Sequence, residues 1–423
     1  MIYLKNCTYI DYKTLKFKNT DILVECGIKG KIHFYKEKPK NIQISENIDC
    51  KGQFVTHSFA NGHHHVYSAL ARGMGAPRKS PENFYEVLQY IWWTLDKCLD
   101  KDMIKASALA TAIACAKSGV CFVIDHHASP NSIKNSLQTI ADAFEEVGIS
   151  HLLCYEITDR DGIALAEKGL NETESYLRIH QGLVGLHASF TVGNDTLKTA
   201  VDLAKKYNSG IHIHVAEDDY DQKHCRETYN KSVAERLDEY GVFQFDKTIL
   251  GHCLYLHENE KKIIAESKSW VVQNMESNLN NRVGYFNGSG LGKRIMLGTD
   301  GMHSDMLQSS KAVFFSGMGH EYNSPAATYE RFRNVHNYIS KNNLNGDGAN
   351  NLVILNYDSP TEITEDNFLG HFVYGINSTH VQHVISNGHL IVKNKVLTTV
   401  NEEEILNFTR KEGKKLWEKM KNS

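Results

Sequence analysis

Short apolar runs of strand length alternate with longer segments of helical pattern through the middle of the chain. The segments between the runs carry the spacing of amphipathic helices, most clearly at 101–117, which is rich in alanine and lacks glycine and proline. Repeated strand–helix alternation is typical of a parallel sheet, so the pattern predicts an α/β protein. The strand-like runs lie at 54–65, 121–127, 150–157, 182–187, 210–216, 248–254, 269–273 and 294–299.

Eight strand–helix units within about 250 residues favour a (β/α)8 barrel, the TIM-like fold. The competing doubly wound sheet should carry a glycine-rich turn after an early strand, and the sequence has no such turn. A long segment at 67–95 follows the first predicted strand. Because long loops after barrel strands usually cover the active site, we expect this segment to act as a cover.

The two ends of the chain have a different pattern from the middle. Residues 1–55 contain only short β-favouring runs, and similar runs return at 351–356, 380–386 and 389–393. Asn387 and Gly388 are a strong hairpin signal between the last two runs. Neither end is long enough to bury a core alone. We therefore expect 1–55 and 346–423 to form one small β-sandwich domain with a C-terminal helix, beside a barrel domain at 56–345.

The composition is that of an ordinary globular protein, with 423 residues, 41% hydrophobic positions and a net charge of −3. No basic cluster indicates a nucleic acid or a membrane surface as a partner. The N-terminus lacks a signal-peptide pattern, and no apolar run is long enough to span a bilayer. The nine cysteines form no CxxC pair, which argues against a zinc ribbon or a disulfide framework. We expect a cytoplasmic protein with reduced thiols.

Histidine is in excess, with 22 copies, and several of them fall at predicted strand ends, where parallel barrels carry their catalytic groups. His63 and His65 end the first strand, and residues i and i+2 of a strand share a face, so both can bind one ion. His214 ends the fifth strand and Asp300 ends the eighth. Three imidazoles and one carboxylate suit a single divalent metal, with zinc preferred and iron as the alternative.

Further polar residues have the same placement. Glu217 starts the loop after the fifth strand, His252 ends the sixth strand, and His187 ends the fourth. His212 lies one layer deeper in the barrel than His214, where we expect a hydrogen-bonded core histidine. Because these histidines lie at strand ends and are not clustered in one tract, their positions favour a catalytic site over a role in metal storage.

These residues resemble the amidohydrolase superfamily, specifically its deaminase and chlorohydrolase branch, over nearly the whole chain. Stretches at 65–74, 92–96, 125–130 and 417–420 are also similar to the SsnA family of aminohydrolases. Two places depart from the usual pattern: 273–278 reads Q-N-M-E-S-N in place of H-N-P-x-S-N, and Ser58 and Phe59 replace a Pro-Gly pair. The motifs are N-x-H-x-H at 61–65, G-L-H-A-S at 185–189, H-x-x-E at 214–217, G-H at 251–252 and L-G-T-D-G at 297–301.

The resemblance implies a mononuclear metal site, because no lysine lies near the fourth strand end, where binuclear members carry a carbamylated lysine. It also implies hydrolytic deamination of a purine- or pterin-like heterocycle by metal-activated water. Asp300 would take a proton from the water, Glu217 would protonate a ring nitrogen and then the leaving ammonia, and His252 would contact the water or the developing oxyanion. Because dimers are usual in the family, we expect a homodimer with a small-molecule substrate.

Candidates for substrate binding come from strand ends and from the long segment after the first strand. His187 and His127 follow predicted strands, and His127 lies within reach of the expected pocket. Trp92 and its neighbour Trp93 are suited to stack on a flat ring. Arg72 is suited to an anionic or carbonyl group of the substrate.

Two secondary candidates and two other functions remain open. Glu156 and Arg160, near the third strand end, are weaker candidates for contact with the substrate. The same site would also suit a chlorohydrolase or an amide or formimino hydrolase, which release of ammonia would distinguish from a deaminase. The remaining alternative is a barrel that binds metal without catalysis.

Overall fold

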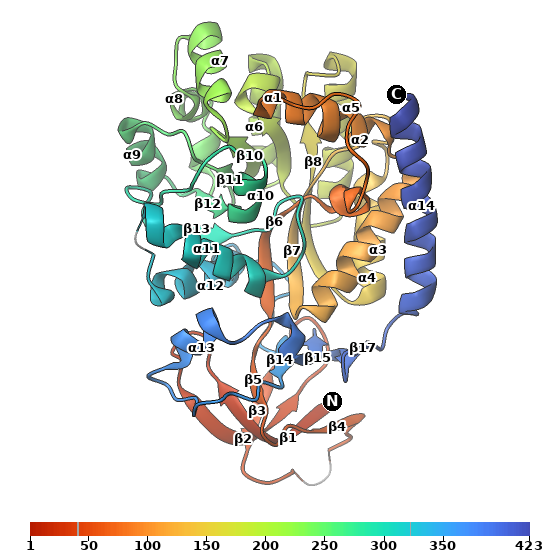
Figure 1. Cartoon of the computed structure of the whole chain (residues 1–423), viewed down its shortest axis with the longest axis vertical. Helices are drawn as coiled ribbons and strands as arrows, with labels where there is room; N and C mark the ends of the chain where they lie inside the picture. Colours follow the sequence, from red (N-terminus) through yellow and green to blue (C-terminus); the bar gives the residue numbers. More distant parts are fainter. Residues whose placement is uncertain (40–41, 322) are drawn as a thin grey trace.

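The computed structural model describes residues 1–39, 42–321 and 323–423, and its centre is an eight-stranded parallel barrel (Figure 1). Neighbouring strands pair in chain order, and a parallel bridge between His64 and Asp300 joins the last strand end to the first. The predicted (β/α)8 barrel is therefore confirmed. The strands are β6 (Phe59–His64), β7 (Val120–His127), β8 (Ser150–Ile157), β9 (Val184–Ala188), β10 (Ile211–Val215), β11 (Ile249–His252), β12 (Trp270–Gln273) and β13 (Ile295–Leu297).

Two glycines allow the barrel to close between β6 and β13. A Cβ on Gly298 would lie 2.8 Å from the Cβ of His63, and a Cβ on Gly62 would lie 2.7 Å from the carbonyl oxygen of Leu297. Both distances are shorter than real Cβ contacts, so any larger residue would push the two strands apart. The close approach lets the backbone N–H of Asp300 donate to the carbonyl of His63 at 3.0 Å, which places both site residues at one rim.

Alternate residues of each barrel strand face the interior. On β7 the inward side chains include Phe122 and Ile124, and on β8 they include Leu152 and Cys154, all packed in one buried cluster. The intervening positions pack against the outer helices in a separate cluster. Side chains of a strand alternate between its two faces, so His126 and Glu156 continue the inward-facing rows toward the upper rim.

Helices surround the barrel, and short helices α1 (Phe84–Val87) and α2 (Trp93–Cys98) cross its upper end (Figure 1). Among the described residues, no helix combines the length and apolar character required to cross a membrane. The surrounding helices are α3 (Lys101–Lys117), α4 (Ser136–Val147), α5 (Ile163–Leu177), α6 (Asn194–Lys206), α7 (Asp219–Tyr229), α8 (Val233–Glu239), α9 (Glu258–Glu266), α10 (Met275–Asn280), α11 (Met306–His320) and α12 (Pro325–Lys341).

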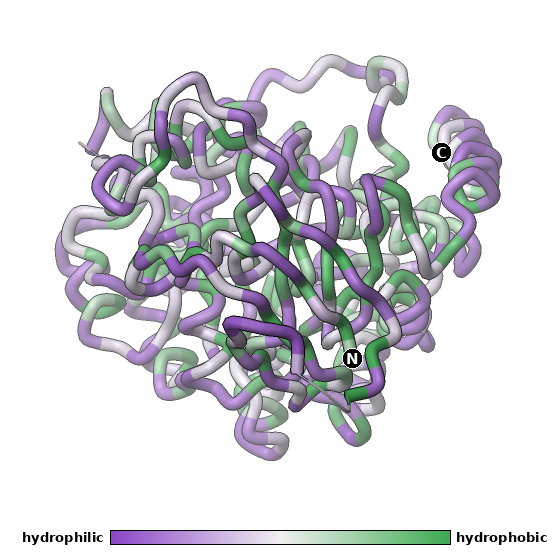
Figure 2. Tube along the Cα trace, turned by 90° about the horizontal axis from the view of Figure 1, so that it is seen from below, coloured by the Kyte–Doolittle hydropathy of each residue, from purple (hydrophilic) through white to green (hydrophobic). Residues whose placement is uncertain are grey.

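Both ends of the chain contribute strands to a second sheet below the barrel, as predicted. β5 and β14 pair in antiparallel fashion and so join the N-terminal and C-terminal strands. Figure 2 looks onto this sheet from below, where hydrophobic and hydrophilic stretches alternate along the chain. Its strands are β1 (Ile2–Ile10), β2 (Phe17–Val24), β3 (Ile32–Tyr35), β4 (Glu46–Asp49), β5 (Phe54–His57), β14 (Leu352–Leu355), β15 (Val381–Ser386), β16 (His389–Lys393) and β17 (Val396–Leu397).

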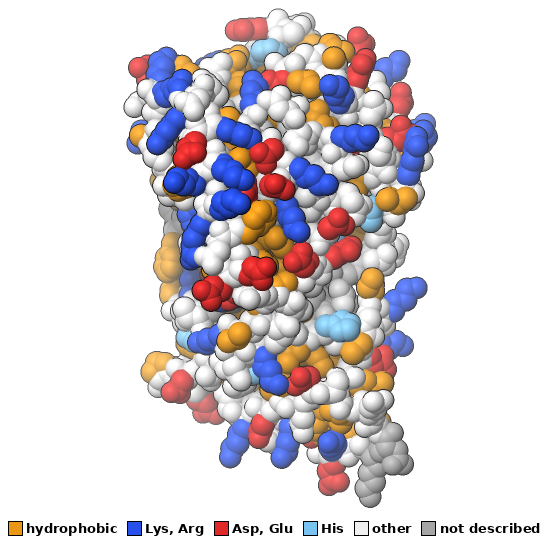
Figure 3. Space-filling model, turned by 90° about the vertical axis from the view of Figure 1, so that its right-hand side faces the viewer, with side chains coloured by type: hydrophobic (Ala, Val, Ile, Leu, Met, Phe, Trp, Pro, Cys, Tyr) orange, Lys and Arg blue, Asp and Glu red, His pale blue; other side chains and the backbone are white. Residues whose placement is uncertain are grey.

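The two remaining helices lie apart from each other. α13 (Phe368–Tyr374) lies near the sheet, whereas α14 (Glu402–Asn422) runs along the side of the barrel against α3 (Figure 1). The indole N–H of Trp417 donates to the carbonyl of Leu70 at 2.8 Å, which ties α14 to the segment after β6. Figure 3 shows basic and acidic side chains interspersed on this side of the molecule.

A cluster of His57, His336 and Asp347, which we call the distal cluster, links the second sheet to the barrel. His57 Nε2 lies 3.0 Å from one Asp347 oxygen, and His336 Nδ1 lies 2.8 Å from the other. Tyr12 stacks on the His57 ring with centroids 4.7 Å apart. The guanidinium of Arg333 donates to the carbonyl oxygens of residues 57 and 58 and lies 3.4 Å from His336 Nε2. These contacts connect β5 to α12.

Candidate metal and catalytic site

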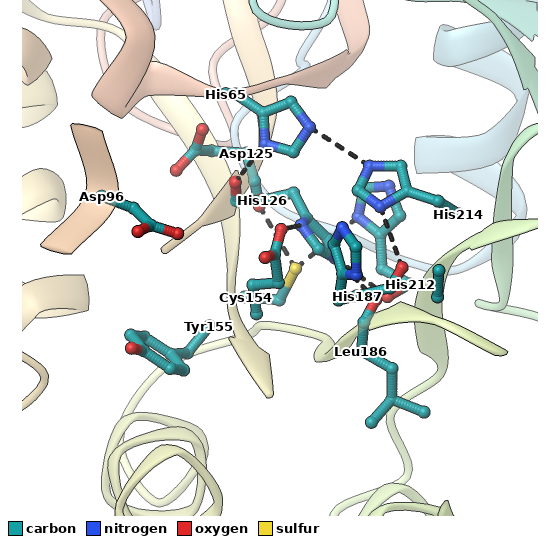
Figure 4. Close-up of polar contacts among 12 residues, drawn as sticks. His65, Asp96, Asp125, His126, Cys154, Tyr155, Leu186, His187, His212 and His214 are labelled. Atoms are coloured by element: carbon teal, nitrogen blue, oxygen red, sulfur yellow. Dashed lines mark hydrogen bonds and ion pairs between the residues drawn. The ribbon is translucent and has the colours of Figure 1, made fainter. Parts of the chain in front are cut away.

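Four side chains from three strand ends converge at the upper rim of the barrel, and we call them the rim cluster. His65 Nε2 lies 3.0 Å from Asp300 Oδ1 and 3.2 Å from His214 Nε2. His63 Nε2 lies 3.4 Å from the same Asp300 oxygen. All four side chains are buried. Figure 4 shows the rings of His65 and His214 directed toward each other.

The second ring nitrogen of each rim histidine is held by a partner on the protein. His63 Nδ1 lies 2.9 Å from His212 Nε2, which agrees with the predicted deeper place of His212. His65 Nδ1 donates to the carbonyl of residue 126 at 2.7 Å, and His214 Nδ1 donates to the carbonyl of residue 187 at 2.9 Å. The Nε2 atoms therefore point at a common centre, and that of His63 is buried without any hydrogen-bond partner. This donor set fits one divalent metal ion.

The electrostatics of the rim cluster favour a cation. Burial lowers the pKa of His63 to about 3, so its ring is neutral and able to act as a ligand. Burial also opposes charge on Asp300 and His65, but their mutual attraction is stronger, so the pKa of Asp300 is well below its usual value and that of His65 is raised to about 9. Binding of a metal would therefore have to release the proton of His65.

Glu217 and His252 lie beside the rim cluster. His252 Nε2 is 3.5 Å from Glu217 Oε2 and 3.8 Å from Asp300 Oδ2, and its Nδ1 is held by Asn278 Oδ1 at 2.8 Å. Burial, together with the negative charge of Asp300, raises the pKa of Glu217 well above its usual value. This direction of the pKa shift favours the protonated carboxyl, the form that can donate a proton.

The backbone is strained where these side chains leave the strands. Ala216, which precedes Glu217, has φ 47°, His252 has φ 66° and Asp300 has φ 52°. Non-glycine residues rarely adopt this left-handed conformation, which costs roughly 1–2 kcal/mol at each position. Such strain is common at functional sites, and here it occurs at His252 and Asp300 and directly before Glu217.

A cavity opens above the rim cluster, and His65, His214 and Asp300 line it. The predicted residues Trp92 and His187 line it, as does Trp93. A narrower extension between α1 and the end of β9 is lined by aromatic side chains. These are Phe84, Tyr85, Phe190 and Tyr220.

Two predicted substrate contacts, Arg72 and His127, lie outside this cavity. Arg72 is exposed and lines a separate surface cavity with Lys117 and His303. His127 is buried outside the barrel interior, where its Nε2 lies 2.9 Å from the Ser129 hydroxyl. Because neighbouring residues of a strand face opposite sides, the inward position at the end of β7 belongs to residue 126.

The structure also places two other polar residues near the rim cluster. The His126 ring lies among the rim histidines, 4.8 Å from the His214 ring between centroids (Figure 4). Glu156, one of the two weaker candidates from the sequence, lines the cavity directly. His126 was not among the candidates. Alternation along β7 would select it, but the sequence does not show which face of this strand points inward, because both faces are apolar.

A family model described as the amidohydrolase family matches residues 54–335, which is most of the barrel. The chain belongs to the amidohydrolase family. This match and the relatives below confirm the predicted membership of the superfamily and of its deaminase branch.

Two relatives align with this amidohydrolase over almost their full lengths. The 5′-deoxyadenosine deaminase of Methanocaldococcus jannaschii is 27% identical, over 92% of this chain and 94% of that protein. The 5-methylthioadenosine/S-adenosylhomocysteine deaminase of Aquifex aeolicus is also 27% identical, over 90% of this chain and 92% of that protein.

Solved structures share the fold at lower identity. A zinc-bound adenosine deaminase from Xanthomonas campestris superposes with a TM-score of 0.83 at 15% identity and covers 98% of both chains. The zinc complex of the atrazine chlorohydrolase TrzN from Arthrobacter aurescens superposes with a TM-score of 0.81 at 15% identity, covering 98% of this chain and all of that one. At this identity the likeness demonstrates a common fold.

Proposed function

We propose that this amidohydrolase is a metal-dependent deaminase that hydrolyses the bond between an amino group and the ring of a purine-like heterocycle. The observation that carries the proposal is the convergence of Glu217, His252, Asp300 and the histidine Nε2 atoms on one cavity, with Glu217 Oε2 3.5 Å from His252 Nε2. The names of the two relatives, both deaminases of adenine nucleosides, support a cyclic amidine as the reacting group.

We propose that His63, His65, His214 and Asp300 bind one zinc ion. Three nitrogens and one oxygen suit zinc, and zinc is bound in two of the structures with this fold. Iron is the alternative for the same ligands. When bound, such an ion lowers the pKa of water enough to provide a nucleophile at neutral pH.

Asp300 and Glu217 carry out different proton transfers in the proposed reaction. Asp300 is ionised and accepts the proton of the attacking water at Oδ2, the oxygen nearer to His252. Glu217 gives its proton to the ring nitrogen next to the reacting carbon, which makes that carbon more electrophilic. Glu217 then takes the proton of the hydroxyl on the reacting carbon and passes it to the amino group, which departs as ammonia. The proton held by Asp300 returns Glu217 to its protonated form. His252, held by Asn278, contacts the oxygen at the reacting carbon.

The aromatic walls of the cavity suit a flat ring. Trp92, Trp93 and His187 line the cavity, and the centroid of the His187 ring lies 6.0 Å from that of Trp93. Aromatic rings pack well on the faces of heterocycles. We propose that Trp92 and His187 contact the substrate.

Release of ammonia by the zinc-loaded enzyme tests this function. We expect turnover of 5′-deoxyadenosine, 5′-methylthioadenosine or adenosine. Glu217→Gln should lower the rate by about 100- to 10,000-fold, since the amide cannot supply the proton, and should keep one metal ion per chain by mass spectrometry. Glu227→Gln, an exposed change on the following helix, should behave as the wild type. Full activity of Glu217→Gln would contradict the proposal.

We also propose that the protein is a cytoplasmic homodimer. All nine cysteines are free thiols, eight of them buried, which fits a reducing compartment. Phe315 of α11 and Tyr374 of α13 are exposed with ring centroids 6.2 Å apart, and Met318 is exposed on α11, the kind of apolar surface that a second copy would cover. Light scattering during gel filtration should give twice the chain mass.

A further inference from the structure

Glu156 is a buried carboxylate on the wall of the cavity, and the proposed chemistry does not use it. It occupies the inward position at the end of β8 and is only 3% exposed. One of its oxygens accepts a hydrogen bond from Arg160 Nη1 at 2.8 Å, and the other lies 3.2 Å from His126 Nδ1. Carboxylates are rarely buried unless they are paired, so its neighbours compensate its charge.

The surroundings hold Glu156 in a single orientation. Arg160 also forms ion pairs with Asp96 of α2 and with Asp161, and its guanidinium lies 5.0 Å from the centre of the Trp93 ring. The same guanidinium therefore fixes both Glu156 and the helix that covers the cavity. His126 is fixed in turn, because its Nε2 donates to the carbonyl of residue 186 at 3.1 Å.

Glu156 retains the capacity to accept hydrogen bonds from a ligand. Each carboxylate oxygen can accept two hydrogen bonds. Arg160 uses one acceptor site of the first oxygen, and His126 lies beside the second oxygen, so each oxygen keeps an acceptor site for a ligand. Burial disfavours the charged form, but His187, His126 and Arg160 outweigh burial and hold the pKa of Glu156 well below its usual value. Glu156 is therefore ionised and can only accept hydrogen bonds.

The charged residues that line the cavity further limit the class of ligand that it can bind. Among the described residues that line the cavity and its aromatic extension, none is lysine or arginine, whereas five are acidic. On the β8 side of the cavity an anionic group, such as a phosphate, would have no lysine or arginine on the wall to pair with and would face Glu156. A neutral molecule with a hydrogen-bond donor meets neither penalty. The acidic residues are Glu156, Glu217, Asp218, Asp221 and Asp300.

We propose that Glu156 determines specificity by accepting a hydrogen bond from an N–H or O–H group of a neutral substrate on the β8 side of the cavity. The proposal rests on the proposed deaminase function and names the feature of the substrate that the site recognises. The donor is either a ring N–H of a free base or a hydroxyl of an attached sugar, which offer the same hydrogen-bond chemistry.

Two matched pairs of compounds separate these donors. Adenosine is compared with 2′,3′-dideoxyadenosine, which lacks two sugar hydroxyls, and adenine with 9-methyladenine, which lacks the ring N–H at position 9. Binding to the zinc-loaded enzyme is measured by calorimetry, and ammonia release gives kcat and KM. We expect the donor-bearing member of at least one pair to bind about 10- to 100-fold more tightly, as expected for a hydrogen bond to a charged group.

Glu156→Gln and Glu156→Asp decide whether Glu156 is the acceptor. Both should reduce the preference within that pair by raising KM for the donor-bearing compound, with little change in kcat or in metal content. Glu156→Asp should reduce it to nearly one, and Glu156→Gln by less, because its amide oxygen still accepts a hydrogen bond but carries no charge. Glu156→Asp keeps the charge beside Arg160 but withdraws the oxygens from the cavity. Glu260→Gln is the matched control: Glu260 is also buried and accepts from Gln222 Nε2, but it lies outside the cavity.

The outcomes separate this proposal from the proposed function. No preference within either pair in the wild type, or an unchanged preference in both Glu156 variants, would overturn the role of Glu156. An equal loss for both members of a pair would assign Glu156 to structural support and would also overturn it. Absence of ammonia from every compound would refute the deaminase function, while the binding preferences would still decide the role of Glu156.

Discussion

The rim cluster and the distal cluster are built from the same kinds of residue, but they differ in how many ligand atoms are already paired. Both bring side chains of histidine and aspartate together: the distal cluster has its ligand atoms within 4.8 Å of one another, and so has the set of His63, His214, His252 and Asp300, which overlaps the rim cluster. In the distal cluster, both Asp347 oxygens are occupied by His57 and His336. In the rim cluster, the histidines direct their Nε2 atoms to one centre, and the Nε2 of His63 has no hydrogen-bond partner.

The charged neighbours of the two clusters differ in the same direction. Arg333, a permanent cation, lies against the distal cluster and would repel a divalent ion. The rim cluster has Asp300 among its own ligands and Glu217 beside it, and it opens to a cavity. The comparison indicates that unpaired ligand atoms and the surrounding charge distinguish a metal site, whereas the residue types alone do not.

The largest expected effect comes from removing one histidine in each cluster. His214→Ala should abolish tight zinc binding and lower ammonia release by about 1,000-fold or more, because the metal contributes several kcal/mol to the reaction. His57→Ala, the same change in the distal cluster, should keep one zinc per chain and near-normal kcat. Metal analysis by mass spectrometry with a deaminase assay checks both variants. Zinc loss in His57→Ala would end the distinction between the clusters.

A smaller effect is expected on stability when the distal cluster loses its aspartate. Asp347→Ala should lower the free energy of unfolding by about 3–5 kcal/mol, since it leaves His57 and His336 without their shared buried acceptor. Denaturant unfolding monitored by circular dichroism measures this loss. Lys16→Ala removes an exposed ion pair with Glu365 as a control and should cost less than about 1 kcal/mol. A loss of the same small size in Asp347→Ala would show that the distal cluster adds no stability.

The smallest effect is a dependence of stability on pH from the distal cluster. Burial lowers the pKa of His336 to about 4, although Asp347 opposes the shift. As the pH decreases, His336 takes up a proton near its ordinary pKa of about 6.5 in the unfolded chain, but only near pH 4 in the folded protein. The free energy of unfolding therefore falls as the pH decreases from about 6.5 to 4. The full contribution of this group is about 3 kcal/mol. Unfolding of His336→Gln across this range should show a flatter profile, and a profile parallel to the wild type would contradict the assignment.

Much of the fold and part of the site followed from local patterns. Each predicted barrel strand overlaps an observed one, and the strand-end residues His63, His65, His214 and Asp300 come together as expected. These predictions succeeded because side-chain periodicity and the position of a residue within a strand depend on near neighbours in the chain.

The predictions of contacts were less successful where both faces of a strand are buried. His127 was expected in the pocket, but the inward residue at the end of β7 is His126, and an apolar sequence on both faces gives no sign of which set points inward. Arg72 lies in a long segment whose course depends on packing, and the structure leaves it at a different cavity. Likewise, α14 was expected with the second sheet, and its contacts with α3 could not be inferred from its charged sequence.

Local sequence alone specified the order of strands and helices and the chemical groups at each strand end, because these depend on residues within a few positions of one another. The folded chain added which ring nitrogens are free and which are paired, as with His63 and His212, 149 positions apart. It also distinguished the rim cluster from the distal one and placed Glu156 against the cavity. These properties arise from contacts between distant segments, whose geometry is set only when the barrel closes and the core packs.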